Sequence, residues 1–109
     1  MIHLRIVALL SALLALTAQV GVAAVLPTTV VVVIQGVSFG AESVPLKRGQ
    51  WVKWINKDPF PHTVTAVGVF DSHSIPSGSS WRYRPMKVGE IEYTCTFHPN
   101  MKAKIKVEE

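Results

Sequence analysis

Three stretches of the chain alternate inward and outward positions with a period of two, the pattern of half-buried β-strands. The residues that share the inward face of each stretch are, in order, Val52, Trp54 and Asn56; Ile91, Tyr93 and Cys95; and Ala103, Ile105 and Val107. In the last two stretches the opposite face carries charged and other polar residues, which suits a sheet with one face in the core and one in water. Cys95 is thus expected on the inward side of a strand, at its end.

Other segments fit the same class less regularly. The β-branched run Thr29–Ile34 predicts a strand buried on both faces. Further strands are expected within Val37–Leu46, His62–Gly68 and Trp81–Arg84, whereas the Ser-, Gly- and Pro-containing segment Phe70–Ser80 predicts a surface connection. Helical periodicity is never sustained beyond a turn or two, so the pattern predicts an all-β sandwich or barrel.

The N-terminus has the three parts of a secretory signal: a short charged start, an apolar run and a small-residue end at Ala24. We therefore expect a signal peptide at residues 1–24, followed by one domain at residues 25–109. The alternative is an uncleaved anchor, because the stretch Ile6–Leu26 is just long enough and apolar enough to span a bilayer. Both alternatives place the domain outside a membrane, and we expect the periplasm.

The charge of the chain is modest. It holds 11 Lys and Arg against 7 Asp and Glu, and removal of residues 1–24 takes away only Arg5, which leaves a net charge of 10 − 7 = +3. The lysines at 102, 104 and 106 alternate along one strand and are typical of a solvated face. We therefore expect no nucleic-acid partner.

The chemistry is concentrated around the single cysteine, Cys95. With one cysteine the chain can form no internal disulfide, so an unpaired thiol in an exported protein needs another explanation. Cys95, His98 and Met101 follow at intervals of three residues, and a thiolate, an imidazole and a thioether are donors that suit copper. The trigonal two-histidine, one-cysteine copper site needs a second histidine, which His62 can supply.

Each of these residues also has a plainer interpretation. Cys95 and His98 could be ordinary structural residues, His62 a hydrogen-bonded core histidine, and Met101 a methionine that fills core space. Taken together, however, the four residues form a complete blue-copper ligand set.

Two segments carry a family resemblance. The stretch Asn56–Val64, taken with Gly89–Cys95 and the ligand loop that follows, resembles the plastocyanin-like cupredoxins, and among them the amicyanin group most, because the ligand loop is short. The resemblance extends from about Thr29 to Val107. It implies a Greek-key β-sandwich that holds one copper ion near one end.

The resemblance also implies roles for residues around the metal. His62 is the buried ligand, and His98 is the ligand whose outer edge reaches the surface and passes electrons. Asn56 is expected to brace the ligand loop by hydrogen bonds at Thr96, as support for the metal ligands. The residues expected to form an apolar collar around His98, where redox partners dock briefly, are Phe60, Pro61, Phe97 and Pro99.

Three functions are compatible with a copper site of this kind. A single-electron carrier fits a closed site with four ligands and a monomeric protein. A periplasmic copper carrier or chaperone is the alternative, although residues 25–109 contain only Met86 and Met101 as methionines. An enzyme is the least favoured, because once His62 and His98 are used only His73 remains within residues 25–109 for a second site.

Overall fold

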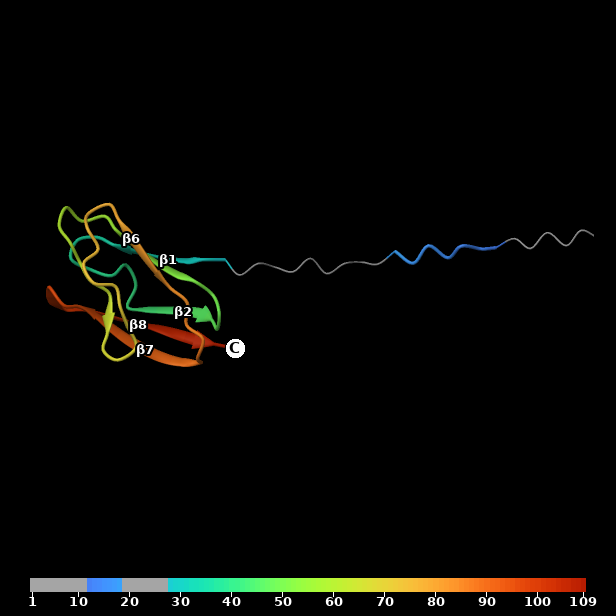
Figure 1. Cartoon of the computed structure of the whole chain (residues 1–109). Coiled ribbons are helices and arrows are strands. Elements are labelled where there is room, and N and C mark those ends of the chain that lie inside the picture. The colour runs from blue at the N-terminus through green and yellow to red at the C-terminus, as the bar shows by residue number, and fades with distance from the viewer. Residues whose placement is uncertain (1–11, 19–27) are drawn as a thin grey trace, which may run out of the picture.

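The computed structural model describes residues 12–18 and 28–109, and its strands lie between Val30 and Glu108 (Figure 1). Most of the expected signal peptide, residues 1–24, lies outside the described residues, so that assignment stays a prediction. Within the described ranges, no helix has the length and apolar character needed to cross a membrane.

The secondary structure of the described part is all β, as predicted. The strands are β1 Val30–Ile34, β2 Ser43–Lys47, β3 Val52–Asn56, β4 Thr65–Ala66, β5 Phe70–Asp71, β6 Ser80–Tyr83, β7 Gly89–Cys95 and β8 His98–Glu108.

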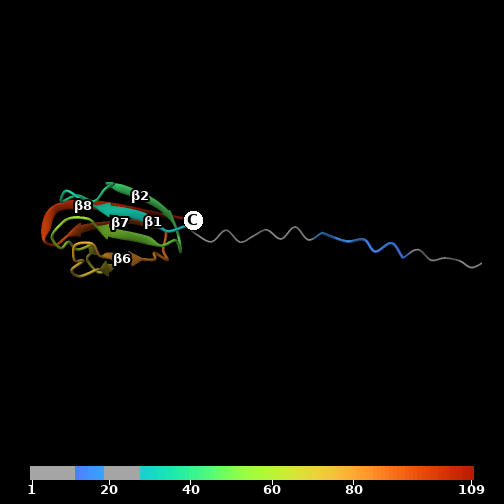
Figure 2. The ribbon, with the colours of Figure 1, turned by 90° about the horizontal axis from the view of Figure 1, so that it is seen from above.

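These strands form two sheets that pack face to face (Figure 2). The three-stranded sheet has the order β1-β3-β6, and the five-stranded sheet has the order β2-β8-β7-β4-β5. β1 runs parallel to β3, and β2 runs parallel to β8, while the remaining neighbours are antiparallel. A parallel pair cannot be closed by a short hairpin, so both parallel pairings join segments far apart in the chain.

The core lies between the two sheets and contains the inward sets predicted from alternation. Trp54 is its centre, with ring centroids 5.3 Å from Tyr93, 5.7 Å from Trp81 and 5.9 Å from Phe70. These rings come from both sheets, so their packing joins the layers. Every buried core side chain of the described residues lies between Val32 and Val107. Among the described residues, the buried core thus lies entirely within 28–109.

Three predicted elements differ from the structure. The β1 strand is not buried on both faces: Val32 and Ile34 face the core, while Val31 is 53% exposed because β1 is an edge strand with no layer outside it. The predicted strand His62–Gly68 contracts to β4, with a single bridge at His62. The segment Phe70–Ser80 is more than a surface connection, because it contributes β5 and a buried Ile75.

The segment that carries most of the candidate ligands is tighter than expected. β7 ends at Cys95 and β8 begins at His98, and these two residues pair across the turn formed by Thr96 and Phe97. Met101 lies inside β8 rather than on a loop. The strand pairing therefore holds Cys95 and His98 from both sides.

Candidate metal centre

Three side chains converge at one end of the sandwich. The donor atoms of His62, Cys95 and His98 lie within 4.8 Å of one another. His62 and Cys95 are fully buried, and His98 is half-buried. The two imidazole rings have centroids 4.9 Å apart. His62 and Cys95 are far apart in the sequence. They meet because β4 pairs with β7, which places the segment after Pro61 beside the end of β7.

The spacing of the donor atoms fits a trigonal metal ion. The Nδ1 atoms of His62 and His98 lie 3.6 Å and 3.8 Å from Cys95 Sγ. Metal–nitrogen and metal–sulfur bonds of roughly 2.0–2.3 Å in a trigonal plane separate nitrogen from sulfur by about 3.7 Å. Both nitrogen–sulfur separations match that value, so the spacing of each histidine from Cys95 suits a shared ion.

Met101 has the burial expected of a fourth ligand. Its side chain is buried. A weak, long axial methionine completes the trigonal copper set. Burial alone is equally typical of a methionine that fills core space.

A buried carboxylate orients His62. Asp58 Oδ2 lies 2.7 Å from His62 Nε2, and both side chains are almost inaccessible to solvent. An ionised carboxylate can only accept, so Nε2 carries the proton and donates it to Asp58. This leaves the Nδ1 lone pair of His62 free toward Cys95, which is the tautomer that binds a metal through Nδ1.

The carboxylate of Asp58 is itself held by the backbone of the β1–β2 connection. The N–H groups of Gly36 and Val37 donate to Oδ1 and Oδ2 over 2.7 Å and 2.9 Å. Burial raises the pKa of Asp58, but hydrogen bonds from Val37, His62 and Gly36 together lower it below its ordinary value. Successive N–H groups of this kind form an anion-binding nest. Asp58 therefore remains a carboxylate beside His62.

The nest has a strained backbone. Gly36 and Val37 both have positive φ angles, 66° and 55°. Glycine adopts this region freely, whereas a β-branched residue does so at a cost. Val37 adopts this costly conformation because it lets the Val37 N–H donate to Asp58 beside the N–H of Gly36.

The thiol of Cys95 also has a backbone donor. The backbone nitrogen of Thr63, the residue after the candidate ligand His62, lies 3.2 Å from Cys95 Sγ and donates to it. A cysteine binds metal as the thiolate, whose sulfur can accept this hydrogen bond.

The turn beside Cys95 is braced by Thr63 rather than by Asn56. Thr63 Oγ1 accepts from Thr96 N over 2.8 Å and lies 3.1 Å from Thr96 Oγ1. The buried amide of Asn56 instead donates to the carbonyl oxygens of Phe60 and Ile75, and its oxygen accepts from Asp58 N. The expected contact between Asn56 and Thr96 is corrected accordingly: Asn56 stabilises the segment that carries His62.

The threonine brace continues toward the surface. Thr65 Oγ1 lies 3.0 Å from Thr63 Oγ1 and 3.2 Å from Asp71 Oδ1. A polar chain thus runs from Asp71 through Thr65 and Thr63 to Thr96. It connects β5, β4 and the turn next to Cys95.

Sequence reasoning missed two residues of this site, Asp58 and Thr63. A detectable signal exists for Asp58, because it stands four residues before His62 in a segment constrained by two prolines. A histidine that binds a metal through one ring nitrogen commonly donates a hydrogen bond from its other ring N–H to a carboxylate.

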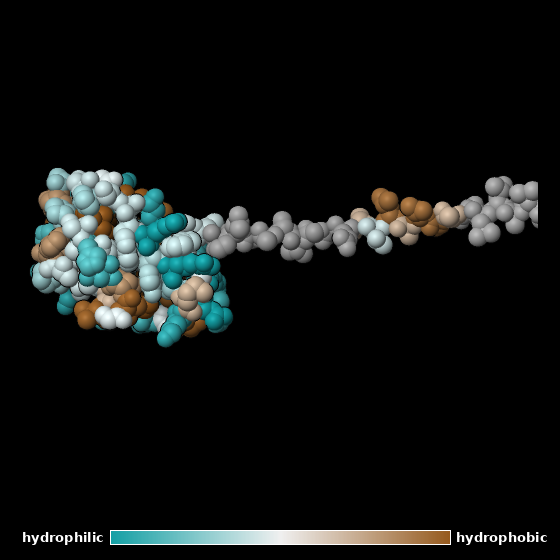
Figure 3. Space-filling model, in the orientation of Figure 1, coloured by the Kyte–Doolittle hydropathy of each residue, from teal (hydrophilic) through white to brown (hydrophobic). Residues whose placement is uncertain are grey.

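Apolar side chains surround the half-buried His98. Phe60 and Phe97 are 38% and 52% exposed, and the Phe60 ring lies 5.7 Å from the His98 ring. Pro61 and Pro99 are exposed in the same two segments. The expected collar residues are thus at the surface. Figure 3 shows apolar patches among the hydrophilic surface on one side of the domain.

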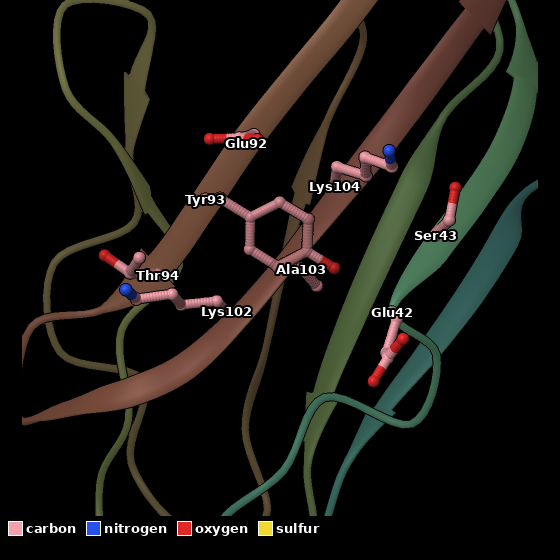
Figure 4. Close-up of a pocket in the computed structure, with 8 residues that line it drawn as sticks. All are labelled: Glu42, Ser43, Glu92, Tyr93, Thr94, Lys102, Ala103 and Lys104. Atoms are coloured by element: carbon pink, nitrogen blue, oxygen red, sulfur yellow. The ribbon is translucent and has the colours of Figure 1, made fainter.

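Another hollow, of about 350 Å³, lies away from the metal centre on the five-stranded sheet (Figure 4). Its lining comes from β7, β8 and the start of β2, and includes Glu42, Glu92, Lys102 and Lys104. Acids and lysines alternate there, as they do on an ordinary solvated sheet face. His73 and Met86 lie outside this hollow, and both side chains are exposed.

The chain is similar in sequence and structure to several known proteins. No protein-family model matches the chain. Amicyanin from Paracoccus versutus is 31% identical over 85 residues, covering 72% of this chain and 64% of that protein. Amicyanin-alpha from Methylorubrum extorquens is 31% identical over 81 residues, covering 69% and 68%. The chain therefore spans about two thirds of the length of these curated relatives.

A solved structure gives the same result. The Cu(I) form of a methionine-to-alanine mutant of amicyanin superposes with a TM-score of 0.72 and 29% identity, over 79% of this chain and 88% of that one. The expected Greek-key sandwich is confirmed by this likeness. Its copper and the thiolate–imidazole donor set agree, so the cofactor of the centre is copper.

Proposed function

Because the chain belongs to the amicyanin group of cupredoxins, we propose that it carries single electrons between redox partner proteins, with His62, Cys95, His98 and Met101 as ligands of one copper ion. Bound copper supplies the change between Cu(I) and Cu(II). The observation that carries the proposal is the convergence of His62, Cys95 and His98 at the end of the sandwich.

The rigidity of the ligand positions favours electron transfer over delivery of the metal. Cys95 and His98 pair across a two-residue turn, and Asp58 fixes the ring of His62. Ligands that keep their positions in both oxidation states reduce the rearrangement that accompanies each transfer. A copper chaperone would instead benefit from ligands that open easily.

The surface around His98 supports transient docking. Phe60 and Phe97 are exposed beside the imidazole of His98. The segment 95–101 contains no Asp or Glu. A small apolar patch of this kind suits a short-lived protein contact. Partners are therefore proposed to dock near His98, with the protein as a monomer.

The proposal assigns no catalytic reaction to the chain. In the described part of the chain, the cluster of possible metal ligands is the one formed by His62, Cys95 and His98. A four-ligand set leaves no open position for substrate. We further propose a periplasmic location, which rests on the signal-like residues 1–24.

Spectroscopy of the purified domain tests the proposal. Residues 28–109 are loaded with Cu(II), and visible absorption and electron paramagnetic resonance spectra are recorded for the parent and for Cys95→Ser. Thiolate coordination in a trigonal site predicts an intense band near ~600 nm and narrow copper hyperfine splitting. Both should be lost in Cys95→Ser, whereas a control with Ser43→Ala, in β2, should retain them.

The alternative function has its own signature. A protein that binds only Cu(I), gives no such band and releases the metal readily to a chelator would be a copper carrier. Reversible reduction and reoxidation with retention of the ion would support the electron carrier. Either result is decisive between the two.

A further inference from the structure

The outer faces of the two sheets differ in charge. On the five-stranded sheet, Glu90 pairs with Lys104 and Lys106 over 3.6 Å and 3.5 Å. The strands β1, β3 and β6 contain no Asp or Glu at all, yet Lys53 and Arg82 lie on them. Neither cation belongs to an ion pair among the described residues.

The cations of the three-stranded sheet are set among apolar side chains. In register across the sheet, Val31 pairs with Lys53, and Lys53 pairs with Arg82. Val31 is 53% exposed, although solvent-facing strand positions are ordinarily polar. The next row brings the half-buried Val33 and Ile55 together. The face is therefore apolar and cationic at once.

Trp51, which directly precedes β3, adds an aromatic ring to this face. The Arg82 guanidinium carbon lies 4.3 Å from the centre of the Trp51 ring, and that of Arg84 lies 6.0 Å from it. A shallow hollow beside them is lined by Thr29, Val31, Lys53, Ser80, Trp81 and Arg82. Tryptophan, arginine and lysine beside apolar side chains are the residues that anchor proteins at a membrane interface.

The position of the face in the chain favours a lipid occupant. β1 forms one edge of the three-stranded sheet, and it is the strand by which the chain enters the domain (Figure 1). In the sequence, only Pro27, Thr28 and Thr29 separate Leu26, the end of the apolar segment, from Val30. Four residue steps span at most about 14 Å. If that segment remains in a bilayer, this sheet must lie near the lipid headgroups.

We propose that the outer face of the three-stranded sheet, defined by Val31, Val33, Trp51, Lys53, Ile55 and Arg82, is a docking surface for an anionic lipid bilayer. Lys53 and Arg82 contact the phosphates, and the valines, the isoleucine and Trp51 enter the headgroup region. The metal centre lies at the end of the sandwich and not on this face, so a bound domain keeps His98 accessible. The inference does not depend on copper.

Vesicle binding by the metal-free domain tests the proposal. Residues 28–109, which contain the whole core, are sedimented with vesicles of phosphatidylcholine and phosphatidylglycerol at 3:1, and with phosphatidylcholine alone. Two double variants remove the same charge: Lys53→Gln with Arg82→Gln, and Lys102→Gln with Lys104→Gln on the other sheet. Circular dichroism confirms that each variant is folded.

We expect the domain to bind anionic vesicles and the variant of β3 and β6 to lose at least about tenfold in affinity, against less than about twofold for the β8 variant. On bound vesicles, Lys53 should be protected from acetylation while Lys102, Lys104 and Lys106 still react. Equal losses in the two variants, or no binding to anionic vesicles, would overturn the proposal. Binding to polyglutamate in place of vesicles, with the same dependence on Lys53 and Arg82, would assign the face to an acidic protein instead.

Discussion

The ring of His62 and the carboxylate of Asp58 form a buried hydrogen bond of 2.7 Å, on the side of the ring opposite to Cys95. Asp58 therefore controls both the tautomer and the orientation of a candidate metal ligand without contacting the metal position. The backbone N–H groups of Gly36 and Val37 hold the carboxylate in turn. A loop between β1 and β2 thus supports the site from a distance.

Replacement of Asp58 by Asn tests this support. The amide keeps the size of the side chain but removes the charge that orients His62, and loss of such a partner costs about 10–100-fold in metal affinity. Competition titration with a copper chelator measures the change. The matched control is Glu92→Gln, on the outward face of β7, which should leave the affinity unchanged. An unaltered affinity in Asp58→Asn would contradict the assigned role.

The threonine brace predicts a loss of stability in Thr63→Val. Valine has the same shape, but the N–H of Thr96 loses its acceptor at 2.8 Å. The free energy of unfolding of the metal-free domain should fall by about 1–2 kcal/mol. Urea denaturation measures it, and Thr94→Val, on the outward face of β7, is the control. Equal effects in the two variants would show that Thr63 braces nothing in particular.

A substitution at Met101 separates a ligand from a core residue. Leucine has nearly the same volume, so Met101→Leu should change the free energy of unfolding by less than about 1.5 kcal/mol. The axial ligand tunes the reduction potential of a copper centre of this type. We therefore expect the potential of the copper-loaded protein to shift while stability is retained. A potential equal to that of the parent would make Met101 a core residue only.

The positive φ of Val37 predicts a stabilising substitution. This region costs a side chain with Cβ roughly 1–2 kcal/mol, and asparagine tolerates it best after glycine. Val37→Asn should raise the melting temperature by about 4–8 °C for each kcal/mol gained. Val31→Asn, at an exposed position in extended β1, should lower it instead. Differential scanning calorimetry measures both, and a lower melting temperature for Val37→Asn would refute the strain.

Acid should weaken the domain through Asp71. The pKa of this carboxyl lies below its ordinary value of 3.8, because the backbone N–H of His73 donates to it; slight burial opposes the shift and the Thr65 hydroxyl adds to it. A lowered folded-state pKa adds stability above the unfolded value, and that stability is lost as the pH falls through the folded value. Melting temperatures of metal-free parent and Asp71→Asn should therefore differ at pH 6 and converge near pH 2. Glu42→Gln serves as the control, and a constant difference across this range would contradict the linkage.

Residue patterns were sufficient for the sandwich and for the residues that face its core. The alternation around Trp54 and Tyr93 predicted their burial, because period-two patterns follow directly from strand geometry. Patterns failed at β1, where Val31 is exposed. A run of valines does not reveal whether a second layer covers the strand, since this depends on the sheet order.

The convergence of His62, Cys95 and His98 was predictable because their donor chemistry is specific and Cys95 has close neighbours in the sequence. The contacts that hold their supports in place were not. Asp58 orients His62 but is itself held by Gly36 and Val37, and Thr63 accepts from Thr96, so both supports depend on contacts between segments that are far apart in the chain. Such contacts leave no periodic signal.

The separation of the ligands along the chain gives the centre a further property. His98 follows Cys95 by 3 residues, whereas His62 precedes it by 33. An unfolded chain keeps the near pair together but loses the distant histidine, so the complete ligand set exists only when the segment after Pro61 has docked beside β7. The visible absorbance of the copper-loaded protein would then monitor folding in real time, because it reports when this long-range contact forms.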